Sequence, residues 1–228
     1  MIKRIFALVI VSVLLIACVG CTNNTGNADN SQTQGDTASN STTNEQPENT
    51  DKPLDSSTPS DSEDGDGGVL IVYFSNSGNT HALTEMITAE FEADTLRLIP
   101  AEPYEWETLF ERAQDELNDG IRPELTDLPE AEVIAQYDTI LLGFPIWWYD
   151  LPMPVWTFLE AYDLSGKTII PYFTHNGSSG GASSLDTIEE LCPDSTVKSD
   201  EALSLWGDRV EGSEEAVKEW LNSLGLMK

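Results

Sequence analysis

The sequence predicts an α/β domain in residues 68–228, with a parallel sheet covered by helices on both faces. First, five short apolar runs alternate with amphipathic segments, which is typical of strands joined by helical crossovers. Second, the run Val69–Phe74 is continuously apolar, as expected for a strand buried on both faces of a sheet. Third, the 161 residues from Gly68 to Lys228 are enough for one sizeable hydrophobic core.

The individual elements follow from the spacing of apolar residues. Short apolar runs indicate strands, and apolar residues three or four apart indicate helices. The expected strands are Val69–Phe74, Thr95–Pro100, Thr139–Phe144, Lys167–Phe173 and Ala202–Leu205. The expected helices are His81–Phe91, Tyr104–Leu117, Pro154–Tyr162, Ser184–Leu191 and Ser213–Leu224, the last with Ser213 as a plain N-cap. Residues 118–136 are polar, so irregular structure with a short helix near Glu130 is expected there.

The N-terminal segment has the pattern of an export signal. Two basic residues at positions 3 and 4 precede an unbroken apolar run, Ile5–Ala17, which is short for a membrane span. The run ends in Leu-Ile-Ala followed by Cys18, an order that resembles the bacterial lipobox. We therefore expect residues 1–17 to be a lipoprotein signal peptide and Cys18 to be lipidated, with Cys21 as the alternative. A retained transmembrane anchor is the other reading.

Residues 18–67 are expected to form the lipidated cysteine and a disordered polar linker, because they contain almost no large apolar side chains. Lipidation would place the protein on the outer face of the bacterial cytoplasmic membrane, since two acyl chains suffice for stable anchoring. Residues 68–228 hold 30 acidic and 8 basic side chains, a net charge of −22, so nucleic acid is not expected as a partner. Cys192 is alone in this part and the two histidines lie far apart, so neither a disulfide framework nor a metal site is expected.

Polar residues follow the first strand. The segment Ser75–Thr80 reads Ser-Asn-Ser-Gly-Asn-Thr and leads directly into a helix. Backbone N–H groups and the positive end of a helix make such a turn an anion site, to which hydroxyl groups add donors. The segment contains neither the Gly-Lys-Ser of a nucleoside triphosphate loop nor G-x-G-x-x-G. A well-capped turn without a ligand is the alternative.

Two more loops belong to the same predicted sheet edge, because ligands of parallel sheets bind outside the carboxyl ends of strands. The loop Pro145–Pro152 contains three consecutive aromatic residues, some of which should be exposed or cover a planar ligand. Packing of all three on the end of the sheet is the alternative. The loop Thr174–Gly181 is rich in glycine, which allows the backbone to approach a ligand closely.

Together the three loops resemble those of the flavodoxin-like family, in particular a subgroup common among bacterial lipoproteins and small reductases. The run IVYFSNSGNT is similar to the family signature, and the segment from PIWWYDLP to THNGSSGGAS is similar to its later loops. The resemblance covers residues 68–228 and implies a five-stranded, doubly wound sheet of order 2-1-3-4-5 that binds FMN. It assigns the phosphate to Ser75, Asn76, Ser77, Gly78, Asn79 and Thr80, one side of the flavin ring to Pro145, Ile146, Trp147 and Trp148, and the other to Thr174, His175, Asn176 and Gly177.

The sequence departs from the family pattern at two positions. Thr84 stands where the signature usually has Ala. Tyr149 stands where relatives often have Gly, whose backbone at positive φ can bond N5 of a half-reduced flavin. Because positive φ is unfavourable for Tyr, we expect a lean toward two-electron chemistry. Tyr149 and His175 are the candidate catalytic residues, with His175 either placing a positive charge near the reduced ring or serving as a plain loop residue. For His81 a surface role is expected.

The resemblance implies a redox flavoprotein whose FMN supplies the chemistry and whose protein supplies orientation and electrostatics. Such a protein would exchange electrons with a redox partner protein or with a small acceptor such as a quinone. The sequence leaves open whether it is an electron carrier or an FMN-dependent oxidoreductase. The alternative from a different class is a binding or interaction module that has kept the fold without redox activity.

Overall fold

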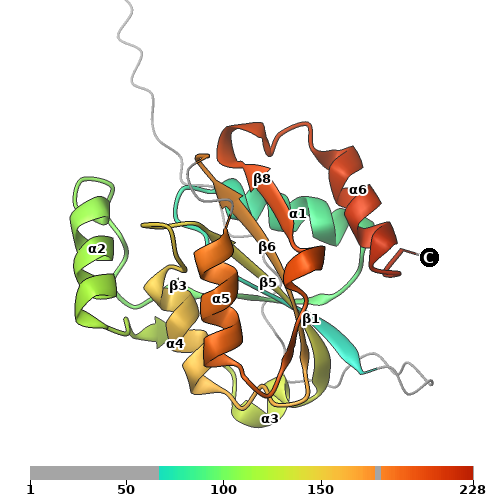
Figure 1. Cartoon of the computed structure of the whole chain (residues 1–228), viewed down its shortest axis with the longest axis horizontal. Coiled ribbons are helices and arrows are strands. Elements are labelled where there is room, and N and C mark those ends of the chain that lie inside the picture. The colour runs from blue at the N-terminus through green and yellow to red at the C-terminus, as the bar shows by residue number, and fades with distance from the viewer. Residues whose placement is uncertain (1–66, 178–180, 228) are drawn as a thin grey trace, which may run out of the picture. The chain divides into compact units, whose positions relative to one another are not determined.

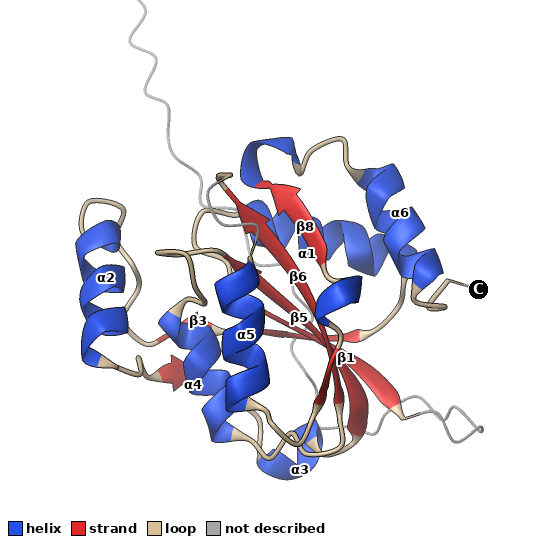
Figure 2. Cartoon of the chain, viewed as in Figure 1, coloured by secondary structure: helices blue, strands red, loops and turns tan. Residues whose placement is uncertain are grey.

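A parallel sheet forms the centre of the computed structural model, which describes residues 67–177 and 181–227. Figure 2 shows its strands between two layers of helices. The expected signal peptide, the lipidated cysteine and the polar linker lie outside the described residues. All described residues fall within one compact unit of the chain, and none of its described helices is long and apolar enough to span a membrane.

The strand order confirms the prediction of 2-1-3-4-5. Parallel pairs join each strand to its neighbour from β2 through β1 and β5 to β6, and two short strands pair with the far side of β6. The strands are β1 (Gly68–Tyr73), β2 (Asp94–Arg97), β5 (Tyr137–Pro145), β6 (Thr168–His175), β7 (Thr196–Val197) and β8 (Leu203–Trp206).

The fifth position of the sheet differs from the prediction because two strands share it. β7 pairs with the start of β6 and β8 pairs with its end, so the described sheet has six strands. A 3₁₀ turn, Ser199–Glu201, separates them. The backbone oxygen of Glu201 accepts a hydrogen bond of 2.7 Å from the indole of Trp220, which ties the turn to the last helix.

Helices cover both faces of the sheet (Figures 1 and 2). Side chains of α1 and α6 belong to the core cluster on one face, and side chains of α3, α4 and α5 belong to the cluster on the other. These helices are α1 (Asn79–Glu90), α3 (Ala131–Ile134), α4 (Met153–Ala161), α5 (Ala182–Leu191) and α6 (Glu214–Ser223).

The continuous apolar run of β1 is explained by these two layers. Successive side chains of a strand point to opposite faces, so Leu70 and Val72 join one core cluster while Ile71 and Tyr73 join the other. All four side chains are fully buried. The same alternation in β5 places Leu141 against α1 and α6, and Ile140 and Leu142 against α4 and α5.

The segment between β2 and β5 departs most from the prediction. The expected strand Thr95–Pro100 divides into β2 and β3 (Ile99–Pro100), and β3 pairs antiparallel with β4 (Leu125–Thr126). The expected helix from Tyr104 begins five residues later, as α2 (Leu109–Asp119), because Tyr104 is buried in the core cluster instead of lying on a helix face. Figure 1 shows α2 standing to one side of the other helices.

The ends of two other helices also differ from the prediction. α1 begins at Asn79 rather than His81, directly after Gly78, and α5 begins at Ala182 after Gly181. Both glycines have positive φ, 94° and 81°. Ser213 precedes α6 but does not cap it through its side chain, because its hydroxyl donates to the backbone oxygen of Arg209.

Candidate functional site

A cleft of about 420 Å³ lies where the loops after β1, β5 and β6 meet. The fold therefore brings together the three loops that the sequence singled out. Its lining residues, none of them Lys, Arg, Asp or Glu, are Asn76, Ser77, Asn79, Trp106, Leu109, Phe110, Ala113, Pro145, Ile146, Trp147, Trp148, Tyr149, Thr174, His175, Asn176 and Gly207.

The loop after β1 carries a buried hydroxyl without a protein partner. Ser75 is 7% exposed, and its Oγ accepts or donates no hydrogen bond among the described residues. The loop then passes Gly78, whose φ of 94° turns the chain into α1. The first N–H groups of a helix have no partner within it, so this loop presents donors and the positive helix end. An anion is the group that such a set of donors fits.

A second polar layer lies beneath this loop. The hydroxyls of Thr80 and Thr174 share a hydrogen bond of 3.0 Å, which joins the loop after β1 to the end of β6. Thr84 donates to the backbone oxygen of Thr80 at 2.9 Å and shares a hydrogen bond of 2.7 Å with the hydroxyl of Tyr172. All four side chains are buried. The replacement of the usual Ala by Thr84 thus adds a hydrogen-bonded support under the loop.

The aromatic loop contains a two-residue turn with two unfavourable backbone conformations. Trp147 and Asp150 exchange both backbone hydrogen bonds, at 3.0 and 2.8 Å. Between them Trp148 has φ 47° and Tyr149 has φ 68°, the pattern of a type I′ turn, which normally contains Asn and Gly. The expectation that Tyr149 would avoid positive φ was therefore wrong, and the lean toward two-electron chemistry loses its basis.

Tertiary contacts hold this turn in place. The Trp148 indole donates to the backbone oxygen of Phe110 at 3.0 Å. Trp147 packs edge-to-face on Phe74 and Tyr104, with centroid distances of 5.2 and 5.0 Å. Trp147 is thus partly buried against the core as well as part of the cleft wall, whereas Trp148 and Tyr149 are exposed. These contacts offset a backbone cost of about 1 kcal/mol or more at each strained residue.

Asp150 connects the turn to α5. Its carboxylate accepts a hydrogen bond of 2.7 Å from the Leu151 N–H and one of 3.1 Å from the hydroxyl of Thr187. Burial raises the pKa of Asp150 above its usual value, and the negative charges of Glu190 and Asp186 act in the same direction. The carboxylate is therefore held by hydrogen bonds but not by a cation.

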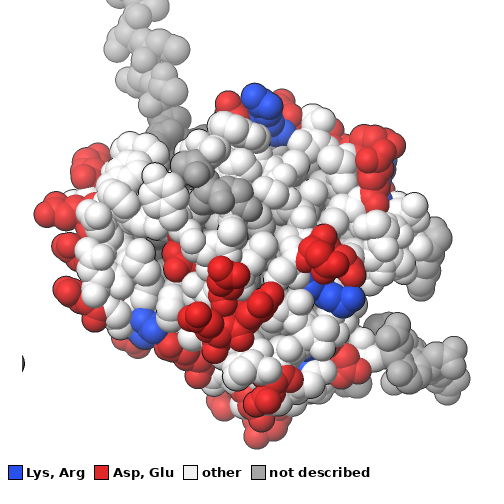
Figure 3. Space-filling model, in the orientation of Figure 1, with Lys and Arg blue, Asp and Glu red and all other residues white. Residues whose placement is uncertain are grey.

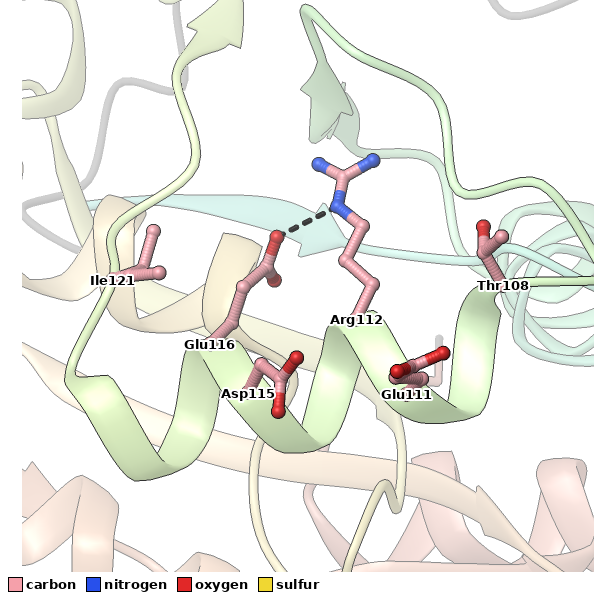
Figure 4. A pocket seen from close by; sticks show the side chains of 6 residues that line it. All are labelled: Thr108, Glu111, Arg112, Asp115, Glu116 and Ile121. Carbon is pink, nitrogen blue, oxygen red and sulfur yellow. Dashed lines mark hydrogen bonds and ion pairs between the residues drawn. The ribbon is translucent and has the colours of Figure 1, made fainter.

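A polar network anchors α2 beside the cleft, and Figure 4 shows the Arg112–Glu116 pair within it. The Glu116 carboxylate accepts hydrogen bonds from the Arg112 guanidinium at 2.8 Å and from the Tyr104 hydroxyl at 2.5 Å. Arg112 also lies 4.0 Å above the centre of the Tyr104 ring. Burial raises the pKa of Tyr104 well above its usual value, and the hydrogen bond to Glu116 adds to the effect. Tyr104 in turn packs on Trp147, so α2 and the aromatic turn are one packed unit.

The loop after β6 closes the opposite wall. Its Gly177 has φ 92° and lies so close to the Trp206 ring that a Cβ would come within 1.9 Å of it. The N–H of Gly177 donates to Nδ1 of His175 at 2.9 Å, so that nitrogen is unprotonated. Burial lowers the pKa of His175 below its usual value. Both observations favour a neutral His175 and oppose the idea that it places a positive charge beside a reduced ring.

His81 is more enclosed than its expected surface role suggests. Its Nδ1 shares a hydrogen bond of 2.8 Å with the Tyr73 hydroxyl, and its ring stacks on that of Tyr73 at a centroid distance of 5.7 Å. Its Nε2 lies 3.8 Å from the exposed carboxylate of Glu85. His81 therefore supports the start of α1 through Tyr73 and does not line the cleft.

The predicted residues divide into lining and supporting groups. Most line the cleft directly, whereas Ser75, Gly78, Thr80 and Gly177 lie behind or beside it. The sequence analysis missed the wall of the cleft formed by Trp106, Leu109, Phe110 and Ala113. It also missed Gly207, which lines the cleft on the opposite side. The available signal was a pair of aromatic residues four positions apart in a segment that is otherwise acidic.

Comparisons with known proteins agree with this fold. A family model described as flavodoxin matches residues 68–224. Candidate flavoproteins from Bacteroides eggerthii and Bacteroides uniformis are each 30% identical with a TM-score of 0.58. They cover 70% and 69% of this chain and 99% of their own. A flavoprotein from Lactobacillus acidophilus, crystallised in complex with FMN, is 22% identical over 68% of this chain and 98% of its own, with a TM-score of 0.50.

No curated protein matches the chain. The parallel sheet of order 2-1-3-4-5, with a cleft formed by the loops at its carboxyl edge, defines a flavodoxin-like fold. The chain belongs to the flavodoxin family.

Proposed function

We propose that the cleft binds FMN without covalent attachment and that the protein is a redox flavoprotein. The observation that carries this proposal is the buried Ser75 hydroxyl, which lacks a partner among the described residues at the positive end of α1. Buried polar groups are nearly always hydrogen-bonded, so an orphaned hydroxyl directly behind the cleft lining, in the loop that leads into α1, indicates a missing partner atom. Family membership favours the phosphate of FMN as the source of that atom.

The chain's own residues would bind and orient the cofactor. The backbone and hydroxyls of residues 75–80 would hold the phosphate, because no cation lines the described cleft. The aromatic turn would cover one side of the flavin ring, and residues 174–177 would line the other. When bound, FMN supplies electron transfer in steps of one or two electrons.

The site would also exclude water from part of the ring. Trp147 packs against Phe74 and Tyr104 and Trp148 is held by its hydrogen bond to Phe110, so both indoles are positioned before a ligand arrives. Preorganised aromatic groups lose little entropy on binding. His175 would meet the ring as a neutral imidazole whose Nε2 carries the proton, since Nδ1 accepts the hydrogen bond from Gly177.

The location of this activity is part of the proposal. Residues 1–17 would direct export, and lipidation of Cys18 would tether residues 68–228 to the outer face of the cytoplasmic membrane. Mass spectrometry of the mature N-terminal peptide tests this step. A diacylated Cys18 supports it, a start at Cys21 corrects the residue, and an unprocessed Met1 contradicts the lipid anchor.

The visible spectrum of the purified protein separates this function from a binding module without a cofactor. A flavin absorption band that is retained through gel filtration and bleached by dithionite supports the redox flavoprotein. A colourless protein that does not take up added FMN would favour the module, because the residues around the cleft would then serve another ligand.

A further inference from the structure

Two aromatic side chains at the mouth of the cleft lie outside the three loops to which FMN binding is assigned. Trp106 and Phe110 are each 64% exposed, more than any other large hydrophobic side chain among the described residues. Their rings pack edge-to-face with a centroid distance of 6.1 Å, and both line the cleft. Exposed apolar side chains that gather beside a cleft mark a contact site for a ligand.

The pair is held in a fixed position relative to the aromatic turn. The backbone oxygen of Phe110 accepts the hydrogen bond from the Trp148 indole. Two residues further along α2, Arg112 reaches the buried carboxylate of Glu116, which also binds Tyr104. These contacts hold the backbone of α2 and leave the two rings themselves uncovered. They therefore keep an exposed apolar surface in a fixed place beside the cleft.

The charge around the pair restricts what can bind there. Glu105, Glu107 and Glu111 flank the two aromatic residues in sequence and are exposed. Arg112, the nearest cation in sequence, has its charge turned inward to Glu116. Figure 3 shows more acidic than basic side chains on the face that it draws, in patches separated by uncharged surface. An anionic ligand would therefore meet repulsion, whereas a neutral planar one would not.

We propose that Trp106 and Phe110 form a docking platform for a neutral, planar, quinone-type acceptor beside the cofactor. This inference rests on the proposed function, because the acceptor takes its electrons from reduced FMN. Two electrons and two protons leave the reduced flavin, and the quinone becomes a hydroquinone while the flavin returns to its oxidised form. The electrons reach the flavin beforehand, and in the reoxidation experiment below dithionite supplies them.

Equilibrium binding tests the platform without turnover. Menadione, a neutral quinone, is titrated by calorimetry into the purified protein loaded with oxidised FMN. W106A and F110A, each kept saturated with FMN, should weaken menadione binding about five- to twentyfold through lost stacking and burial. W106F keeps an aromatic ring and should bind menadione within about twofold of the wild type. I121A is the matched control, because Ile121 is an exposed apolar residue just beyond α2 that does not line the cleft.

A charged probe tests the selectivity. Naphthoquinone sulfonate, which is anionic, should bind the wild type at least about tenfold more weakly than menadione at low salt. The difference in affinity between the two quinones should narrow in about 0.5 M salt, because the screening length is then roughly 4 Å. In stopped-flow experiments, the rate at which menadione reoxidises the dithionite-reduced wild type should saturate with menadione concentration. In W106A this rate should rise without saturation over the same concentrations.

Three results would overturn the inference, and they differ in what they leave standing. Equal menadione binding by wild type, W106A and F110A would remove the platform but leave FMN binding intact. Loss of FMN affinity in these variants would assign the two rings to the flavin instead. A wild type that binds no FMN would overturn the proposed function, and the platform would fall with it.

Discussion

Removal of the Ser75 hydroxyl should have opposite effects on FMN affinity and on the stability of the protein without FMN. In the structure this hydroxyl is buried and has no partner among the described residues. If this hydroxyl binds a phosphate oxygen of FMN, S75A loses a hydrogen bond to a charged group, which contributes about 1.5–3 kcal/mol to the binding free energy. The dissociation constant of FMN should then rise roughly ten- to a hundredfold.

Without FMN the same substitution should stabilise the protein. An unsatisfied buried hydroxyl costs about 1–3 kcal/mol in desolvation, and its removal recovers part of that cost at the expense of some packing. The free energy of unfolding of S75A should therefore rise by up to about 2 kcal/mol. Urea unfolding of the stripped protein measures this change, and fluorescence titration with FMN measures the affinity.

Two control variants separate this effect from general changes in the fold. Ser184 is also buried without a partner among the described residues, but it lies in α5 and not in the loop after β1, so S184A should gain stability and keep its FMN affinity. T80V should lose about 1 kcal/mol of stability, because the Thr80 hydroxyl already binds Thr174. If S75A binds FMN as tightly as the wild type, the assignment of the phosphate to this loop is refuted.

Three further outcomes follow from the charges of the site. FMN should bind more tightly as the salt concentration rises from about 0.02 to 0.2 M. The reason is that salt screens the repulsion between the phosphate and a domain of net charge −22. Weaker FMN binding at high salt would contradict a site whose described lining contains no cation. In an NMR titration the pKa of His175 should lie below 6.5, and an H81Q variant identifies which histidine signal belongs to His175. A pKa above 6.5 would again allow His175 to place a positive charge beside the reduced flavin. D150N should be more stable than the wild type at neutral pH, since burial raises the pKa of Asp150 and its ionisation opposes folding. That advantage should vanish as the pH falls below about 3.8, and a D150N that is less stable at neutral pH would refute the reasoning.

The strands and loops that depend on local pattern could be predicted from the sequence. Val69–Phe74 and Thr139–Phe144 are buried on both faces, so their continuous apolar runs had one simple interpretation, and the polar loops after them followed directly. The fifth strand was harder, because β7 and β8 are short and the turn between them is held by a bond from the distant Trp220.

The features that depend on tertiary contacts could not be predicted. A type I′ turn with Trp148 and Tyr149 contradicts local preference and persists because Phe110 and the core around Trp147 hold it. The late start of α2 depends on burial of Tyr104, a residue that fitted the helical spacing equally well. Nothing in a sequence distinguishes a serine whose hydroxyl has a partner from one, such as Ser75, whose hydroxyl has none.

The most direct test of the central claim is a fluorescence titration of FMN with the purified, flavin-free protein. One FMN should bind per chain with a dissociation constant at or below about 1 μM, corresponding to about −8 kcal/mol. Flavin emission should be quenched, because Trp147 and Trp148 line the cleft in which the ring would lie. Full flavin emission in the presence of tens of micromolar protein would contradict FMN binding in this cleft.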